Sequence, residues 1–238
     1  MKYAVILAGG SGSRMGNTER PKQFLMLGDK PILIHTLEQF YVHPEIDKIV
    51  ICINPEWLHY AEDLISKYLP NTENIDIVEG GETRADSLMN GCYHIKEKYG
   101  LKKDDIIVSH DAVTPFLTQK MITDNIELCL KYGATDTVYP AVETIVQSKD
   151  GKFITEIPIR KEMYYGQNPQ AFNIQKLIKL FESLTEKEKQ TLTDGCKIFT
   201  TKGEKVALVN GKDYNIKITT LYNLKVANAI LETGVNHD

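Results

Sequence analysis

Two apolar patterns alternate along this chain of 238 residues. Short runs in which most residues are apolar predict strands buried in a sheet, and they cover 3–7, 48–53, 75–78, 104–109, 135–141 and 206–209. Apolar residues at helical spacing predict helices between these runs, over 31–41, 55–68, 85–95, 118–132, 174–184 and from 220 onward, with a more polar helical region over 186–200. Strands that alternate with helices are typical of an α/β fold.

One stretch departs from this order. Residues 142–160 alternate between apolar and polar side chains and contain Asp150-Gly151, which is a strong hairpin signal. An isolated hairpin is only marginally stable in water. We therefore expect a β-arm at about 139–168 that packs against a partner, most simply a second copy of the chain. No internal repeat or linker interrupts the rest, so we expect one domain over 1–238.

Composition excludes several classes of protein. The net charge of −4 argues against a nucleic-acid partner, whose binding surface is normally basic. No apolar run approaches the length of a membrane span, and the N-terminus enters a strand without a signal peptide. We expect a cytoplasmic protein with no membrane partner. The four cysteines lack the spacing of a metal site, and we expect buried thiols at Cys52, Cys92, Cys129 and Cys196.

The first predicted strand runs into a glycine-rich turn. Such a turn brings backbone N–H groups close to a phosphate, because a Cβ would block the approach. The spacing of Gly9, Gly10 and Gly12 fits neither a P-loop nor a dinucleotide fingerprint. Two cations follow, Arg14 and Lys22, and a bundle of backbone donors with two cations suits a triphosphate. The alternative is a plain turn with two solvated cations.

Two later strand ends carry candidate chemistry. The third strand leads into Gly80-Gly81, followed by Glu82 and Ser87, whose polar groups could read the edge of a base. The fourth strand is followed by Asp111, at the edge where parallel sheets bind ligands. Its hard carboxylate oxygens suit Mg²⁺. The alternatives are an ordinary glycine turn and a carboxylate that caps a turn or helix.

The ordered motifs resemble one family over residues 4–229. The string L-A-G-G-x-G-x-R-M followed by P-K-Q is similar to the nucleotidyltransferases that activate polyol phosphates, and most similar to the cytidylyltransferase family that contains the 2-C-methyl-D-erythritol 4-phosphate and ribitol 5-phosphate enzymes. The resemblance implies a Rossmann-like α/β fold, with a mixed, mainly parallel sheet and helices on both faces. It implies transfer of CMP from CTP to a polyol phosphate with Mg²⁺ or another divalent cation.

The resemblance also assigns residues to roles. It implies catalytic roles for Arg14, Lys22 and Lys217, the last in the N-I-K-I-T string. It implies that Asp111, in H-D-A, holds the metal, with Asp213 as a second ligand. The remaining residues are implied to bind CTP: Leu7, Ala8, Gly9, Gly10, Gly12, Gly80, Gly81, Glu82, Arg84, Ser87 and Ala112.

The acceptor side departs from the family pattern. Thr114 stands where the family has Arg, and Asn168 where it has Thr. The resemblance implies a homodimer that exchanges the arm, with Thr144 and Arg160 entering the neighbouring site to hold the acceptor phosphate. The string P-I-R-x-E-M-Y-x-G-Q-x-P-Q-x-F resembles the ribitol 5-phosphate enzymes, which would make CDP-ribitol for wall teichoic acid or a related polymer.

Other functions remain open at this point. The acceptor could be 2-C-methyl-D-erythritol 4-phosphate, which belongs to isoprenoid synthesis. A nicotinamide-dependent oxidoreductase would need an acidic residue after the second strand, where the chain has Ile53-Asn54-Pro55. A nucleotide-binding module without turnover would not need all of Arg14, Lys22, Asp111 and Lys217.

Overall fold

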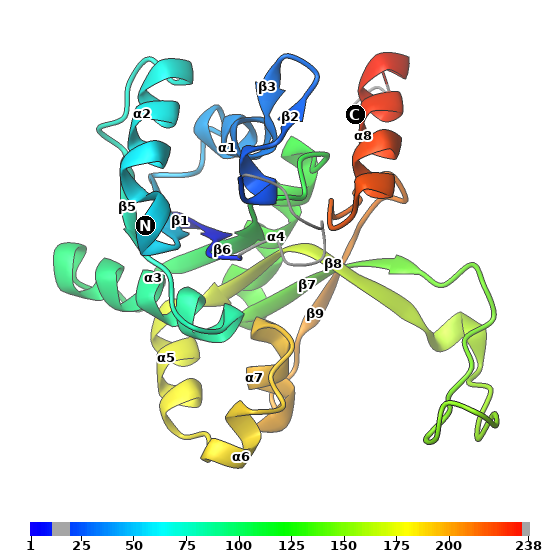
Figure 1. Cartoon of the computed structure of the whole chain (residues 1–238). Coiled ribbons are helices and arrows are strands. Elements are labelled where there is room, and N and C mark those ends of the chain that lie inside the picture. The colour runs from blue at the N-terminus through cyan, green and yellow to red at the C-terminus, as the bar shows by residue number, and fades with distance from the viewer. Residues whose placement is uncertain (11–19, 235–238) are drawn as a thin grey trace.

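The computed structural model describes residues 1–10 and 20–234. Its main feature is a seven-stranded sheet in the order β5-β4-β1-β6-β8-β7-β9 (Figure 1). The strands are β1 (Lys2–Ala8), β4 (Lys48–Ile53), β5 (Ile75–Glu79), β6 (Ile106–Asp111), β7 (Ala134–Pro140), β8 (Tyr164–Asn173) and β9 (Ala207–Asn210). Neighbouring strands are parallel except that β8 runs antiparallel to both β6 and β7. The expected mixed, mainly parallel sheet is confirmed.

Helices cover both faces of the sheet, also as expected (Figure 1). One face packs against α1 (Ile32–Tyr41), α2 (Leu58–Tyr68) and α4 (Gln119–Tyr132), and the other against α3 (Arg84–Tyr99), α5 (Ile174–Glu182) and α7 (Gly195–Thr201). Alternate residues of a strand point to opposite faces. Accordingly, Ala4 and Ile6 of β1 belong to the first core and Tyr3 and Val5 to the second.

A smaller third core lies at one end of the molecule. It joins the short hairpin of β2 (Met26–Leu27) and β3 (Lys30–Pro31) to the final helix α8 (Leu221–Thr233). Leu27, Val113 and Ile218 are buried there. This core fixes the segment around Lys217 against the end of β6, because Ile218 N donates to Val113 O at 2.8 Å.

The predicted element boundaries hold where apolar periodicity is strong. The strand over 48–53 is β4, and Thr118 caps α4 by accepting a bond from Met121 N. The region over 186–200 is broken, because α6 (Glu186–Lys189) ends before Asp194 caps α7. The helix over 55–68 opens with the 3-10 turn η3 (Pro55–Trp57). β6 ends at Asp111, two residues beyond the predicted strand, so that this aspartate belongs to the strand itself.

The arm leaves the body of the molecule between β7 and β8 (Figure 1). The expected hairpin is sparsely paired: within the arm only Gln147 and Glu156 form a β-bridge, which is antiparallel, and η4 (Arg160–Glu162) follows. The predicted turn is present, with Gly151 at φ 70° and the Asp150 carboxylate accepting from Lys152 N. Because the bridge between Gln147 and Glu156 is the one bridge found within the described arm, the arm gains little stability from strand pairing.

The structure bears on two further expectations. All four cysteines are buried free thiols. In the described residues, no helix has the length and apolar character needed to cross a membrane.

Candidate active site

A cavity of about 380 Å³ opens at the carboxyl ends of β1 and β6. Nearly all of the described residues that were predicted to bind CTP or to act in catalysis line it. They are Leu7, Ala8, Gly9, Gly10, Lys22, Gly81, Glu82, Arg84, Ser87, Asp111, Ala112 and Lys217. Gly80 lies beside it, whereas Gly12 and Arg14 lie outside the described residues. The cavity therefore unites motifs that are up to about 200 positions apart in the chain.

The two glycine turns approach each other closely. A Cβ on Gly9 would lie 3.3 Å from Ser87 Oγ, and one on Gly81 would lie 2.3 Å from the Cβ of Asp86. Glycine is required at position 81 because the start of α3 fills the space, not because of its φ angle. Ser87 Oγ accepts a bond from Gly81 N at 3.0 Å, so this hydroxyl holds the turn that forms one wall of the cavity.

Lys22 stands at the opposite wall. It begins the 3-10 turn η2 (Lys22–Phe24), and a Cβ on Gly10 would lie 4.0 Å from its Cε. Gln23 donates from Nε2 to Ala8 O at 2.7 Å, and the Phe24 ring packs on Tyr60 at 4.8 Å. These two contacts fix η2 independently of the lysine. The Lys22 amine is thus presented beside the backbone of the first glycine turn.

Asp111 lies buried at the centre of the site. Arg84 Nε donates to its Oδ1 at 3.0 Å, and both Lys217 Nζ and Asn168 Nδ2 donate to its Oδ2, the latter at 3.1 Å. Burial alone would raise the pKa of Asp111, but the adjacent Arg84 and Lys217 charges hold it well below its usual range. The carboxylate is therefore ionised throughout the neutral range.

Arg84, which was expected to bind CTP, pairs with the carboxylate of Asp111. It lines the cavity, but its charge is directed at Asp111, and its Nη2 donates to Asn168 Oδ1 at 3.3 Å. Asn168 is held in turn by Asn215, which donates from Nδ2 to its backbone oxygen at 2.7 Å. Within the described contacts Arg84 therefore organises the carboxylate.

The residues present fit a single-carboxylate Mg²⁺ site. Mg²⁺ in nucleotide sites is commonly held by one or two carboxylates together with substrate phosphates. Asp111 Oδ1 accepts only the Arg84 bond among those found, which leaves it acceptor capacity. Asp213, the expected second ligand, does not line the cavity, and its carboxylate accepts from Tyr214 N. Its role as a metal ligand stays a prediction.

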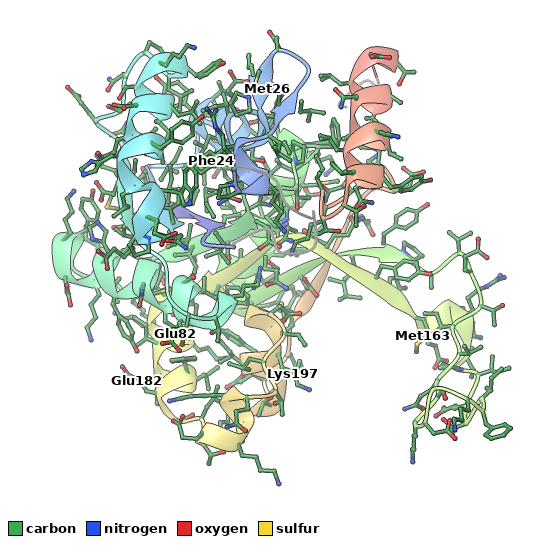
Figure 2. All side chains as sticks on the ribbon, in the orientation of Figure 1. Phe24, Met26, Glu82, Met163, Glu182 and Lys197 are labelled. Atoms are coloured by element: carbon green, nitrogen blue, oxygen red, sulfur yellow. The ribbon has the colours of Figure 1, made fainter. Side chains whose placement is uncertain are left out.

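The acceptor residues divide into two groups. Asn168 contacts Asp111, whereas Thr114 is buried behind the cavity wall, where its backbone oxygen pairs with His110 Nε2 at 2.8 Å. The Thr114 hydroxyl is buried without a hydrogen-bond partner among the described residues, and its contact with an acceptor stays a prediction. Thr144 and Arg160 are exposed on the arm. Figure 2 shows Met163 on the arm, well away from Glu82 at the start of α3.

Two polar residues in or near the site were not predicted. Thr193 lines the cavity, in the loop that precedes α7. Asp136 lies on β7, where Gln170 Nε2 donates to its Oδ1 at 2.8 Å. Burial raises the pKa of Asp136 to about 6, with a smaller contribution from Asp194. The Thr-Asp-Gly string within the 186–200 region was the available signal for Thr193. An aspartate within a predicted strand was the signal for Asp136.

Asp136 should make stability depend on pH. Its pKa is about 6 in the folded chain against 3.8 for an ordinary aspartate, so the folded state binds the proton more tightly. The contribution of Asp136 to stability is fully present below about pH 4 and is lost as the pH rises through 6. Asp136→Asn removes that cost, so the variant should melt above the wild type at pH 8 and close to it at pH 4. Thermal unfolding at both values, with Asp124→Asn as control, checks this; a lower melting temperature at pH 8 would contradict it.

Comparison with known proteins agrees with this geometry. Residues 2–233 match the family model described as "IspD: 2-C-methyl-D-erythritol 4-phosphate cytidylyltransferase". A 4-diphosphocytidyl-2C-methyl-D-erythritol synthase from Anaerococcus prevotii is 29% identical with a TM-score of 0.80, covering 97% of this chain and 96% of that one. The 2-C-methyl-D-erythritol 4-phosphate cytidylyltransferase of Francisella tularensis is also 29% identical, with a TM-score of 0.78 over 96% and 98%. The chain therefore belongs to the IspD family and is a CTP-dependent cytidylyltransferase.

Proposed function

We propose that this enzyme transfers CMP from CTP to the phosphate of a linear polyol phosphate and releases pyrophosphate. The supporting observation is that Lys22, Asp111 and Lys217 line one cavity together with residues of both glycine turns. A nucleotide binder without turnover would not need a buried carboxylate between two cations at that position.

The chemistry follows from this arrangement of charges. An oxygen of the acceptor phosphate attacks the α-phosphorus of CTP in line, and the bond to the β,γ-pyrophosphate breaks. The attacking phosphate is already ionised near neutral pH, so no general base is required. Lys22 and Lys217 stabilise the charge that develops on the transferred and leaving groups. Asp111 would hold Mg²⁺, which when bound neutralises phosphate charge.

For the acceptor, we propose ribitol 5-phosphate. The support is the segment over 158–172, P-I-R-K-E-M-Y-Y-G-Q-N-P-Q-A-F, in the form that resembles the ribitol 5-phosphate enzymes. The second candidate is 2-C-methyl-D-erythritol 4-phosphate, and the comparisons favour it: the matching family model and the solved relatives from Anaerococcus prevotii and Francisella tularensis carry that substrate in their names.

The arm supports a homodimer as part of this proposal. Val146, Phe153, Ile154, Ile157 and Ile159 each expose more than half of their surface on it. Apolar side chains gathered on a projecting segment favour an interaction surface. In the dimer each arm would cross to the other subunit, and Thr144 and Arg160 would hold the acceptor phosphate there. Arg160 is suited to this, because a guanidinium binds phosphate through two parallel hydrogen bonds.

Pyrophosphate release tests the proposal. The enzyme is incubated with CTP and Mg²⁺, and with ribitol 5-phosphate, methylerythritol phosphate or no acceptor. We expect release with ribitol 5-phosphate and none without an acceptor, and loss of release when EDTA removes the metal. Release with methylerythritol phosphate alone would overturn the acceptor assignment and keep the reaction. Silence with both acceptors while CTP still binds would contradict the proposed acceptor class.

A further inference from the structure

A partly buried carboxylate without a role in the proposed reaction lies on β7, outside the residues that line the cavity. Asp136 on β7 and Gln170 on β8 occupy paired register positions and are joined by their side chains. Two residues before Gln170 on the same strand, Asn168 contacts Asp111. A row of polar side chains therefore leads from the metal-binding carboxylate to Asp136.

The start of α7 closes over the far end of this row. Asp194 caps α7 by accepting from Lys197 N at 2.9 Å, and the residue before it, Thr193, lines the cavity. The Cys196 thiol donates to Thr135 O, next to Asp136 on β7. In Figure 2, Lys197 on α7 and Glu82 at the start of α3 lie on the same side of the sheet. Asp136 thus lies near the loop before α7, which contributes Thr193 to the lining of the cavity.

Unsatisfied polar atoms lie along the same row. Gln170 is 3% exposed, and its Oε1 has no hydrogen-bond partner in the described structure; the same is true of Arg84 Nη1 near Asp111. Buried polar atoms in folded proteins nearly always have a partner. Gly166 also leaves space beside Asp136, since the nearest atom a Cβ there would meet is Asp136 Oδ2, at 3.6 Å. The row therefore offers hydrogen-bonding atoms that lack partners, and there is space beside the Asp136 carboxylate.

We propose that Asp136, positioned by Gln170, binds hydroxyl groups of the acceptor's polyol chain and so determines which acceptor is used. The inference rests on the proposed function. With the acceptor phosphate near Asp111 and Lys217, the rest of the molecule extends past Asn168 towards β7. Hydroxyls donate to a carboxylate in charge-assisted bonds, which are stronger than bonds between neutral groups. A carboxylate whose ionised form is made costly by burial is a sign of such a use.

Asp136→Asn tests the inference by kinetics. We expect the acceptor KM to rise about tenfold or more, as for loss of a hydrogen bond to a charged group, with the KM for CTP within about twofold of wild type. An acceptor one carbon shorter, erythritol 4-phosphate, adds a second readout: the wild type should discriminate against it, and the variant should discriminate less. Asp124→Asn, on α4 at the other face, is the matched control and should change neither value.

Gly166→Ala provides a second test that does not depend on removing a buried group. The added methyl would lie 3.6 Å from Asp136 Oδ2, an ordinary contact, so the variant should fold like the wild type. It would cover the carboxylate, and the acceptor KM should rise while the KM for CTP stays unchanged. Normal acceptor KM values in both variants, or an equal rise for CTP and acceptor, would overturn the inference. If the wild type itself releases no pyrophosphate with either polyol phosphate, it is the proposed function that fails.

Discussion

Replacing Lys22 with alanine should lower kcat by roughly 100- to 1000-fold, as for loss of one preorganised group that stabilises transition-state charge. The amine lies beside Gly10 at the turn where the triphosphate is proposed to bind. Charge builds on the leaving pyrophosphate as its bond to the α-phosphorus breaks, so the effect should appear at saturating CTP and acceptor. Single-turnover and steady-state pyrophosphate release measure it.

The fold gives this prediction a clean control. Gln23 and Phe24 anchor η2 through contacts of their own, so the variant should keep the wild-type fold, which thermal unfolding checks. Lys30→Ala removes a lysine whose amine pairs with Glu38 at 2.7 Å outside the cavity, and it should leave kcat unchanged. A normal kcat for Lys22→Ala would remove this lysine from the mechanism.

At an acceptor concentration well below the KM of Arg160→Ala, a mixed dimer should be more active than either Lys22→Ala or Arg160→Ala alone. In a dimer of one Lys22→Ala chain and one Arg160→Ala chain, one site combines both lesions and the other combines neither, provided that each site takes Arg160 from the partner subunit. Each mixed dimer should then have about half of the wild-type activity, since one of two symmetric sites is intact. Alone, Arg160→Ala should mainly raise the acceptor KM.

The experiment uses chains with two different affinity tags, so that the mixed species can be isolated before assay. Its control is a mixed dimer of Lys22→Ala with Lys217→Ala, in which both lesions lie in the body of each chain and no intact site forms. No recovery in the first mixture would contradict sharing of Arg160 between subunits. Among the described residues of one chain, the Arg160 guanidinium donates to Val142 O on the arm at 3.1 Å.

Apolar periodicity predicted most of the fold because the parallel strands are buried on both faces. β4 is completely apolar after its first residue and its bounds were predicted correctly. β8 was missed for the opposite reason: Gln167, Asn168 and Gln170 break the pattern, and Pro169 removes a ladder donor next to a register shift. Asn168 contacts Asp111 and Gln167 pairs with the backbone of Lys212, so polar side chains with specific partners hide the strand.

The site was predictable where motifs follow strand ends, and not where partners come from distant strands. The two glycine turns and Asp111 were placed correctly because carboxyl ends of parallel strands share one edge. The contact of Arg84 with Asp111 depends on how α3 packs beside β6, which local sequence does not encode. Asp213 was expected to face the metal site, and in the structure its carboxylate accepts a hydrogen bond from Tyr214 N. Whether Thr144 and Arg160 reach an acceptor remains a prediction.

The most direct test of the central claim follows the phosphates of CTP. The enzyme, Mg²⁺ and ribitol 5-phosphate are incubated with CTP labelled at either the α- or the γ-phosphorus, and the products are separated. Transfer of CMP predicts that α-label moves into a CDP-polyol while γ-label leaves as pyrophosphate. Appearance of γ-label in the polyol, or of α-label only in free CMP, would show phosphoryl transfer or hydrolysis and would contradict the account.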